Sequence, residues 1–148
     1  MINYGKQWID DQDIASVLEV LKSDFLTQGP KVKAFEETLA EITGARYCVA
    51  VANGTAALHL AVAALKIPAD KNGITSAITF AASANSMLYS GIKPGFCDVD
   101  PNTICLDPED LKNTITPDTE LVIPVHFAGL AADMNSISTI ARKHNIRI

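Results

Sequence analysis

From residue 46 onward, short runs of strand character alternate with longer runs of helical character. Strands separated by helices require crossover connections, which produce a mainly parallel sheet with helices on both faces. The alternation therefore predicts an α/β fold. The predicted strands are 47–52, 74–78, 93–98 and 121–125, with strand character resuming at 146–148, and the predicted helices are 54–66, 79–90, 108–115 and 133–145.

The first 45 residues predict two helices. Acidic residues within 10–13 suit the first turn of a helix, and the apolar residues that follow recur at helical spacing until about Ser23. Pro30 suits the first turn of a second helix, and Gly44 suits its end. We therefore expect a helical arm at 1–45, followed by the first part of an α/β domain at 46–148.

Composition favours a small-molecule partner. A chain of 148 residues that is 48% hydrophobic can bury one sizeable core. The net charge of -5, with no cluster of Lys or Arg, argues against a nucleic-acid or anionic membrane surface. No stretch resembles a signal peptide or an uninterrupted membrane span, so we expect a cytoplasmic protein. Three cysteines without a C-x-x-C pair predict free thiols in a reducing compartment: Cys48, Cys97 and Cys105.

The candidate site lies at one edge of the predicted sheet. Ligands of such sheets bind beyond the carboxyl ends of the strands. Three segments leave predicted strands there, 53–57, 79–85 and 126–129, and we expect them to converge. The first begins with Asn-Gly-Thr ahead of a helix. It predicts either a phosphate site made of backbone N–H groups and a hydroxyl, or an ordinary turn with a threonine cap.

Each candidate side chain at this edge has two interpretations. Phe80 is either a core residue or a ring that stacks on a planar cofactor. His126 is either a satisfied structural residue or a catalyst. Asn85 either faces solvent or donates into a cleft. Asp98 and Asp100 have a catalytic appearance, but a turn before proline is the simpler interpretation.

Several site types lack their signatures in this sequence. It contains no G-x-x-x-x-G-K-[ST] loop, no G-x-G-x-x-G fingerprint and no G-x-S-x-G elbow. No His, Cys and carboxylate cluster has the spacing of a metal site, so no metal is expected. A phosphate cradle, an aromatic ring and polar groups at one edge suit a planar phosphorylated cofactor.

Five blocks in order resemble the DegT/StrS family of pyridoxal-phosphate-dependent nucleotide-sugar aminotransferases: 26–30, 53–60, 78–85, 91–101 and 124–129. The resemblance covers nearly the whole chain. It implies the fold of type I aminotransferases, pyridoxal 5'-phosphate as cofactor, a homodimer, and transfer of an amino group, typically from glutamate, to a keto-sugar nucleotide. The Tyr4 arm and the Leu-Thr-Gln-Gly block are most similar to the branch that acts on a UDP-linked 4-keto-hexose for pseudaminic acid.

The resemblance also implies roles for individual residues. Those of the cofactor site are Gly54, Thr55 and Ala56 at the phosphate, Phe80 on the pyridine ring, and Asn85 and His126 nearby. Those of the sugar-nucleotide pocket are Tyr4, Thr27, Gln28 and Gly29.

The family's Schiff-base lysine and the acidic partner of the pyridine nitrogen fall after Ile148. We therefore expect the chain to be the N-terminal part of an aminotransferase and to be inactive alone. Two alternatives remain: a small non-catalytic α/β domain that binds a phosphorylated ligand, and a relative that has lost its lysine and only binds or regulates.

Overall fold

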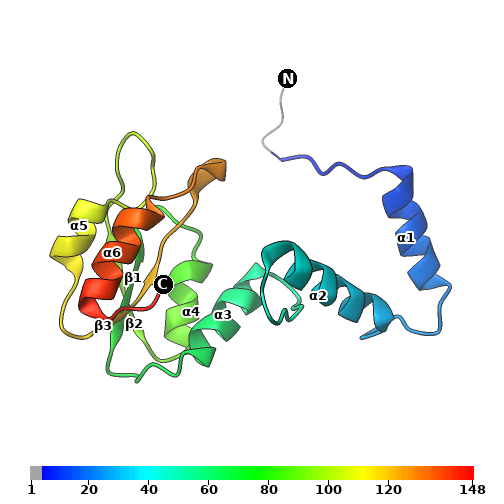
Figure 1. Ribbon diagram of the computed structural model, residues 1–148, viewed down its shortest axis with the longest axis horizontal. Coiled ribbons are helices and arrows are strands. Elements are labelled where there is room, and N and C mark those ends of the chain that lie inside the picture. Colours follow the sequence, from blue (N-terminus) through cyan, green and yellow to red (C-terminus); the bar gives the residue numbers. More distant parts are fainter. Residues whose placement is uncertain (1–4) are drawn as a thin grey trace. The chain divides into compact units, whose positions relative to one another are not determined.

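The computed structural model describes residues 5–148, which form two compact units divided after Ala50 (Figure 1). The predicted substrate residue Tyr4 lies outside the described residues. No helix within the described part of the chain has both the length and the apolar character needed to cross a membrane.

The first unit contains the two predicted helices, α1 (Asp11–Leu21) and α2 (Pro30–Thr43). A reciprocal capping box begins α1, because Asp10 Oδ1 accepts from the Asp13 N–H at 3.0 Å and Asp13 Oδ2 accepts from the Asp10 N–H at 3.0 Å. Pro30 starts α2, and Gly44 ends it in the left-handed conformation with φ of 69°. The prediction of both helices is confirmed.

The predicted strand at 47–52 is wrong. These residues have no strand structure, and Tyr47 and Val49 are 76% and 73% exposed. A strand forms only when a neighbouring strand pairs with its backbone groups, and no strand of residues 5–148 pairs with this segment. The N–H of Ala50 donates instead to the Glu36 carboxylate of α2 at 2.7 Å. β-propensity alone therefore did not determine the structure of this segment.

The second unit contains a three-stranded parallel sheet in the order β2-β1-β3, made of β1 (Asn72–Ser76), β2 (Lys93–Cys97) and β3 (Thr119–Ile123). The first and third strands begin two residues earlier than predicted, because their polar starts did not fit an apolar run. A glycine occupies position 73 of β1, where a Cβ would come within 2.7 Å of Met87 Sδ.

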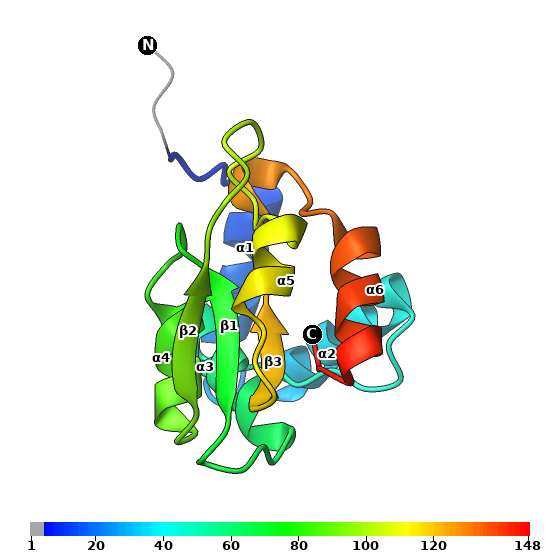
Figure 2. The same ribbon diagram turned by 90° about the vertical axis from the view of Figure 1, so that its left-hand side faces the viewer.

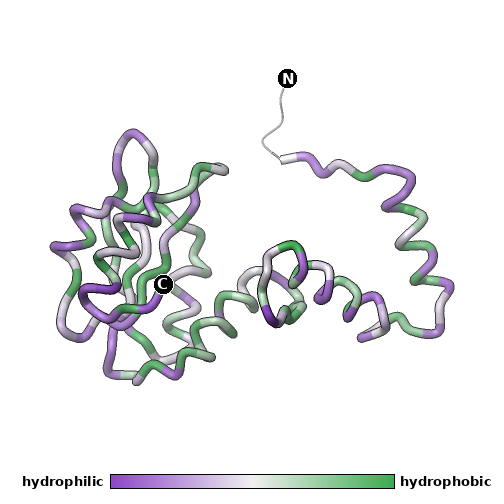
Figure 3. The backbone as a smooth tube through the Cα atoms, in the orientation of Figure 1, coloured by the Kyte–Doolittle hydropathy of each residue, from purple (hydrophilic) through white to green (hydrophobic). Residues whose placement is uncertain are grey.

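Helices cover both faces of this sheet (Figure 2). The helices are α3 (Gly54–Ala64), α4 (Ala82–Tyr89), α5 (Pro108–Thr114) and α6 (Met134–His144). Ile74 and Val122 pack with Leu111 of α5 and Ile137 of α6 in one core cluster. The other face of the sheet packs against α3, which is coloured mostly hydrophobic in Figure 3, and against α4. This arrangement confirms the predicted α/β architecture.

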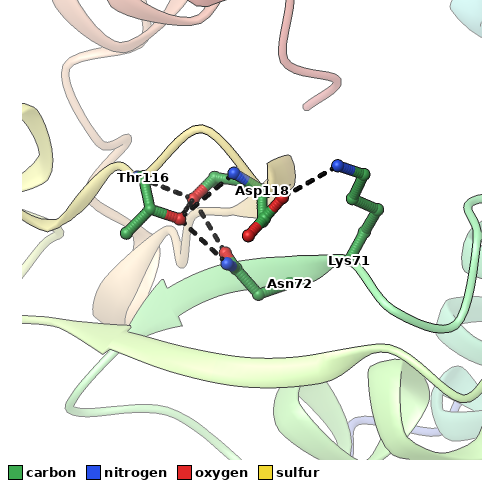
Figure 4. Close-up of polar contacts among 5 residues, drawn as sticks. Lys71, Asn72, Thr116 and Asp118 are labelled. Atoms are coloured by element: carbon green, nitrogen blue, oxygen red, sulfur yellow. Dashed lines mark hydrogen bonds and ion pairs between the residues drawn. The ribbon is translucent and has the colours of Figure 1, made fainter.

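A network of polar side chains connects β1 and β3 at the amino edge of the sheet (Figure 4). Lys71 Nζ contacts Asp118 Oδ1 at 2.9 Å, and Asn72 Nδ2 donates to Thr116 Oγ1 at 3.0 Å. Thr119, 5% exposed, donates its hydroxyl to Asn72 Oδ1 at 2.7 Å. These bonds join the starts of β1 and β3 at the amino edge of the sheet. They do not involve the carboxyl edge.

Residues 146–148, predicted to resume strand character, form one isolated β-bridge beside β3. Arg147 forms a parallel bridge to Leu121, and its carbonyl accepts from the Val122 N–H at 2.8 Å. The register shift of β3 at its start brings Glu120 to Arg147, which donates its N–H to the Glu120 carbonyl at 3.0 Å and pairs with its carboxylate at 2.9 Å.

Candidate functional site

The carboxyl edge of the sheet carries the turns that follow β1 and β3. Because the strands are parallel, residues 77–81 and 124–129 emerge at the same edge. α3 leads through residues 65–71 to the amino end of β1, so its N-terminus points toward the carboxyl edge. α3 also packs along α4, whose first residue is Ala82. The three predicted segments therefore face one end of the second unit.

Asn53, not Thr55, caps α3. Its Oδ1 accepts from the Ala56 N–H at 2.9 Å, and its carbonyl accepts from the Ala57 N–H at 3.1 Å. The threonine cap proposed from the sequence is thus wrong in detail, because asparagine one position before the helix has the better geometry for this bond. Asn53 begins the predicted segment 53–57, but its capping role was not predicted, although the preference of Asn for N-caps was a sufficient signal.

The capping arrangement determines which donors remain for an anion. Ala56 already donates to Asn53. The N–H groups of Gly54 and Thr55 and the Thr55 hydroxyl have no hydrogen-bond partner within residues 5–148. No heavy atom lies within 4 Å of a Cβ placed on Gly54, so the approach to these donors is open. Two N–H groups and a hydroxyl at the positive end of a helix fit a phosphate.

Phe80 lies in the turn between β1 and α4 and is 78% exposed. This exposure is unusual for a ring of this size, and it leaves a face available for stacking. The turn itself is well fixed, because the hydroxyls of Thr79 and Ser83 lie 2.7 Å apart and the Ser83 N–H donates to the Phe80 carbonyl at 3.0 Å. Asn85, half-buried in α4, has no recorded side-chain partner within the described chain.

His126 follows β3, and its imidazole accepts a hydrogen bond. The N–H of Ala132 donates to His126 Nδ1 at 3.1 Å. The side chain is exposed although this one nitrogen is engaged. The Nδ1 atom of His126 therefore has a structural partner within the chain. This supports the interpretation of His126 as a structural residue, but only for Nδ1.

The predicted substrate residues of the first unit lie in the turn between α1 and α2. Gln28 has a left-handed φ of 47°, and a Cβ on Gly29 would come within 2.7 Å of Phe25 Cβ, so only glycine fits there. Gln28 and Gly29 line a cavity of about 140 Å³, whereas Thr27 does not. This volume is small beside the roughly 300 Å³ at which ligand pockets begin, so the cavity alone does not enclose a sugar nucleotide.

The acidic residues after β2 serve the local structure. Asp100 accepts from the N–H groups of Asn102 and Thr103 at 2.8 and 3.0 Å, and these bonds lower the pKa of its carboxyl group. Asp110 accepts from the Asp98 N–H at 2.8 Å, which likewise lowers the Asp110 pKa. The turn interpretation of this segment is confirmed. Among residues 5–148, no three His, Cys, Asp or Glu side chains form a group suited to a metal ion.

The parallel α/β sheet and its helices place the chain among fold type I pyridoxal-phosphate aminotransferases, which are its structural neighbours. Residues 7–148 match the model of the DegT/DnrJ/EryC1/StrS aminotransferase family. The chain belongs to this family.

Individual relatives show the same similarity. The spore coat polysaccharide biosynthesis protein SpsC of Bacillus subtilis is 41% identical over 143 residues, which are 97% of this chain and 37% of SpsC. The aminotransferase PseC of Helicobacter pylori is 33% identical with a TM-score of 0.90, over 97% of this chain and 39% of PseC. The pyridoxal-phosphate form of the sugar aminotransferase Spr1654 of Streptococcus pneumoniae is 28% identical with a TM-score of 0.90, over 99% of this chain and 38% of that protein.

The chain thus spans little more than a third of the length of these relatives. Spr1654 is known in both pyridoxal-phosphate and pyridoxamine-phosphate forms, the two forms that an aminotransferase cofactor adopts. The family membership supports pyridoxal phosphate as the cofactor of the present protein, and the free donors of Gly54 and Thr55 are chemically suited to its phosphate group.

Proposed function

We propose that the full-length product of this gene is a pyridoxal-phosphate-dependent aminotransferase that moves an amino group from glutamate to a keto-sugar nucleotide. The observation that carries this proposal is the N-terminus of α3, where the N–H groups of Gly54 and Thr55 and the Thr55 hydroxyl have no partner within residues 5–148. The bound cofactor supplies the electron sink for exchange of the amino group.

The residues of the chain would bind and orient that cofactor. Gly54 and Thr55 would hold the phosphate, with Ala56 completing the first turn of the helix. Phe80 would stack on the pyridine ring, and its exposed face supports this role. Asn85 and His126 would lie beside the ring. A stacked ring between fixed turns also limits the access of water to one face of the cofactor.

For the substrate, we propose a more specific acceptor than the family membership alone indicates. The pocket for the sugar nucleotide would be bordered by Tyr4, Thr27, Gln28 and Gly29. We assign these residues to an N-terminal arm, 1–45, and residues 46–148 to the first part of a separate cofactor-binding domain. A UDP-linked 4-keto-hexose of the pseudaminic acid type would be the acceptor. Similarity to PseC, described as an aminotransferase involved in the biosynthesis of pseudoaminic acid, supports this choice.

We also propose a cellular setting for the reaction. A homodimer in the cytoplasm would supply amino sugars for cell-surface polysaccharide, and the similarity to a spore coat polysaccharide biosynthesis protein supports that role.

The test is an amino-transfer assay on the full-length gene product. Protein, pyridoxal phosphate, glutamate and a UDP-4-keto-hexose are incubated together, and 2-oxoglutarate and the amino sugar are measured by mass spectrometry. We expect equal amounts of the two products. Omission of the keto sugar should limit 2-oxoglutarate to one equivalent per cofactor. Cofactor binding without either product would contradict the proposal and favour a non-catalytic module that binds a phosphorylated ligand.

A further inference from the structure

The turn after β3 has an unfavourable backbone conformation. Ala128 has φ of 50° and ψ of 33°, which places a residue with a Cβ in the left-handed region, and Gly129 follows with φ of 88°. An alanine in this region is destabilised relative to an ordinary conformation, because its Cβ approaches the following carbonyl oxygen. The turn therefore needs interactions that hold it in place.

Two interactions hold the far end of this turn. Ala132 is buried, 4% exposed, in the core cluster that contains Ile137. Its N–H donates to His126 Nδ1 at 3.1 Å. Between them, the Leu130 N–H donates to the Phe127 carbonyl at 2.9 Å. The side chain of His126 thus closes a loop of seven residues whose two ends are fixed to β3 and to the core.

The same bond determines the tautomer of the imidazole. An Nδ1 atom that accepts a hydrogen bond carries a lone pair and no proton, so the neutral ring carries its proton on Nε2. His126 is exposed, and the remaining nitrogen therefore offers a donor rather than an acceptor.

We propose that His126 is a positioning residue of the cofactor site: through its Nδ1–Ala132 bond it holds the strained turn 126–132 in place at the carboxyl edge of the sheet. The inference rests on the proposed function, because that function makes this edge the cofactor site. It assigns the importance of His126 to the bond within the chain and not to contact with the cofactor.

The closing experiment compares three variants of the full-length protein. In His126→Asn the amide oxygen replaces Nδ1 on the same Cγ atom, whereas the longer chain of His126→Gln places its amide where it cannot replace Nδ1, and His126→Ala has no acceptor. Two quantities are measured: amide hydrogen exchange at Ala132, and the dissociation constant for pyridoxal phosphate. Exchange of the α6 amides serves as the control for folding.

We expect the Ala132 amide to exchange roughly fivefold faster in the Gln and Ala variants, since one hydrogen bond contributes about 1 kcal/mol, which corresponds to a factor of about five. Cofactor affinity should fall by no more than the same factor, because an effect through the turn is bounded by the free energy of opening the turn. His126→Asn should restore both quantities.

Three outcomes would overturn the proposal: unchanged exchange in the Gln and Ala variants, faster exchange with unchanged cofactor affinity, or an Asn variant that keeps the protection but loses the cofactor. The last result would mean direct contact with the ligand. Failure of the wild-type protein to bind pyridoxal phosphate would instead refute the proposed function, and with it the role of His126 in a cofactor site, while the exchange data would still report on the bond within the turn.

Discussion

Asn53 and Thr55 have different roles in the first turn of α3. Asn53 satisfies the Ala56 N–H, and this leaves the donors of Gly54 and Thr55 directed outward without a partner in the described chain. The Asn-Gly-Thr sequence was enough to predict the start of a helix. It was not enough to predict the distribution of bonds, because Asn and Thr are both good capping residues and only the backbone angles decide between them.

The hydroxyl of Thr55 is expected to stabilise the bound cofactor. Thr55→Val keeps the shape of the side chain and removes the hydroxyl, and loss of a hydrogen bond to a charged acceptor costs about 1.5–3 kcal/mol. We expect pyridoxal phosphate to bind roughly 10- to 150-fold more weakly to the full-length variant in a fluorescence titration. Thr55→Ser should retain most of the affinity. Equal affinity of the Val variant and the wild type would remove Thr55 from the phosphate site.

Cys97 is expected to be chemically inert in the folded protein. It is fully buried, and burial, followed by the nearby Asp110, raises the pKa of its thiol to about 12. Iodoacetamide reacts with thiolates, so at pH 8 the native protein should be labelled at the half-buried Cys48 and not at Cys97. Peptide mapping before and after denaturation measures this difference, and Cys48→Ser is the control. Labelling of native Cys97 at the rate of Cys48 would contradict the expected burial.

At the scale of elements, helices were predicted more accurately than strands. Asp133 and Asn145, the two ends of one predicted helix, are the cap residues of α6. Strand positions depend on pairing partners. Gly73 belongs to β1 because it pairs with β2 and β3, and 47–52 forms no strand because no partner is present in the described residues. Such contacts over long sequence distances are not encoded in local periodicity.

The cap of α6 should make the stability of the second unit depend on pH. Asp133 accepts from the Ser136 hydroxyl at 2.6 Å and from its N–H at 3.0 Å, and both bonds lower the pKa of the Asp133 carboxyl group. The folded state then binds fewer protons than the unfolded state. The cap therefore stabilises fully above about pH 4, the ordinary pKa of aspartate, and its contribution is lost as the pH falls through the lowered value.

Asp133→Asn keeps a capping side chain and removes this titration. We expect its urea midpoint to change less than that of the wild type between pH 5 and pH 3. Asp24→Asn is the matched control, since Asp24 makes no side-chain hydrogen bond within residues 5–148. Identical pH dependence of Asp133→Asn and the wild type would show that the cap does not contribute through its charge.

For the whole molecule, the order of blocks along the chain was more informative than any single block. The alternation of strands and helices from residue 46 predicted the parallel sheet, and the parallel sheet brings the turns after β1 and β3 to one edge. Phe80 and His126 could therefore be assigned to that edge from the sequence. The bond from Ala132 to His126 could not, because it depends on the left-handed backbone of Ala128, for which the sequence has no glycine signal.

The last prediction concerns covalent attachment of the cofactor. A lysine that attacks an aldehyde must be neutral, but the Asp118 carboxylate, at 2.9 Å, raises the pKa of Lys71 and keeps it charged. Lys31 and Lys112 also form ion pairs, with Glu19 and Glu109. Since the resemblance also implies that the Schiff-base lysine falls after Ile148, we expect the polypeptide 1–148, mixed with pyridoxal phosphate and reduced with borohydride, to carry no stoichiometric label at any single lysine.

The full-length gene product should behave differently under the same conditions. Peptide mapping is expected to find one labelled lysine outside residues 1–148, and addition of glutamate before reduction should remove most of the label, since amino transfer releases the cofactor from the lysine. Stoichiometric labelling of one lysine within 1–148 in both proteins would contradict this assignment. If that lysine were Lys31, Lys71 or Lys112, the result would also mean that its ion pair opens readily enough for the amine to become a nucleophile.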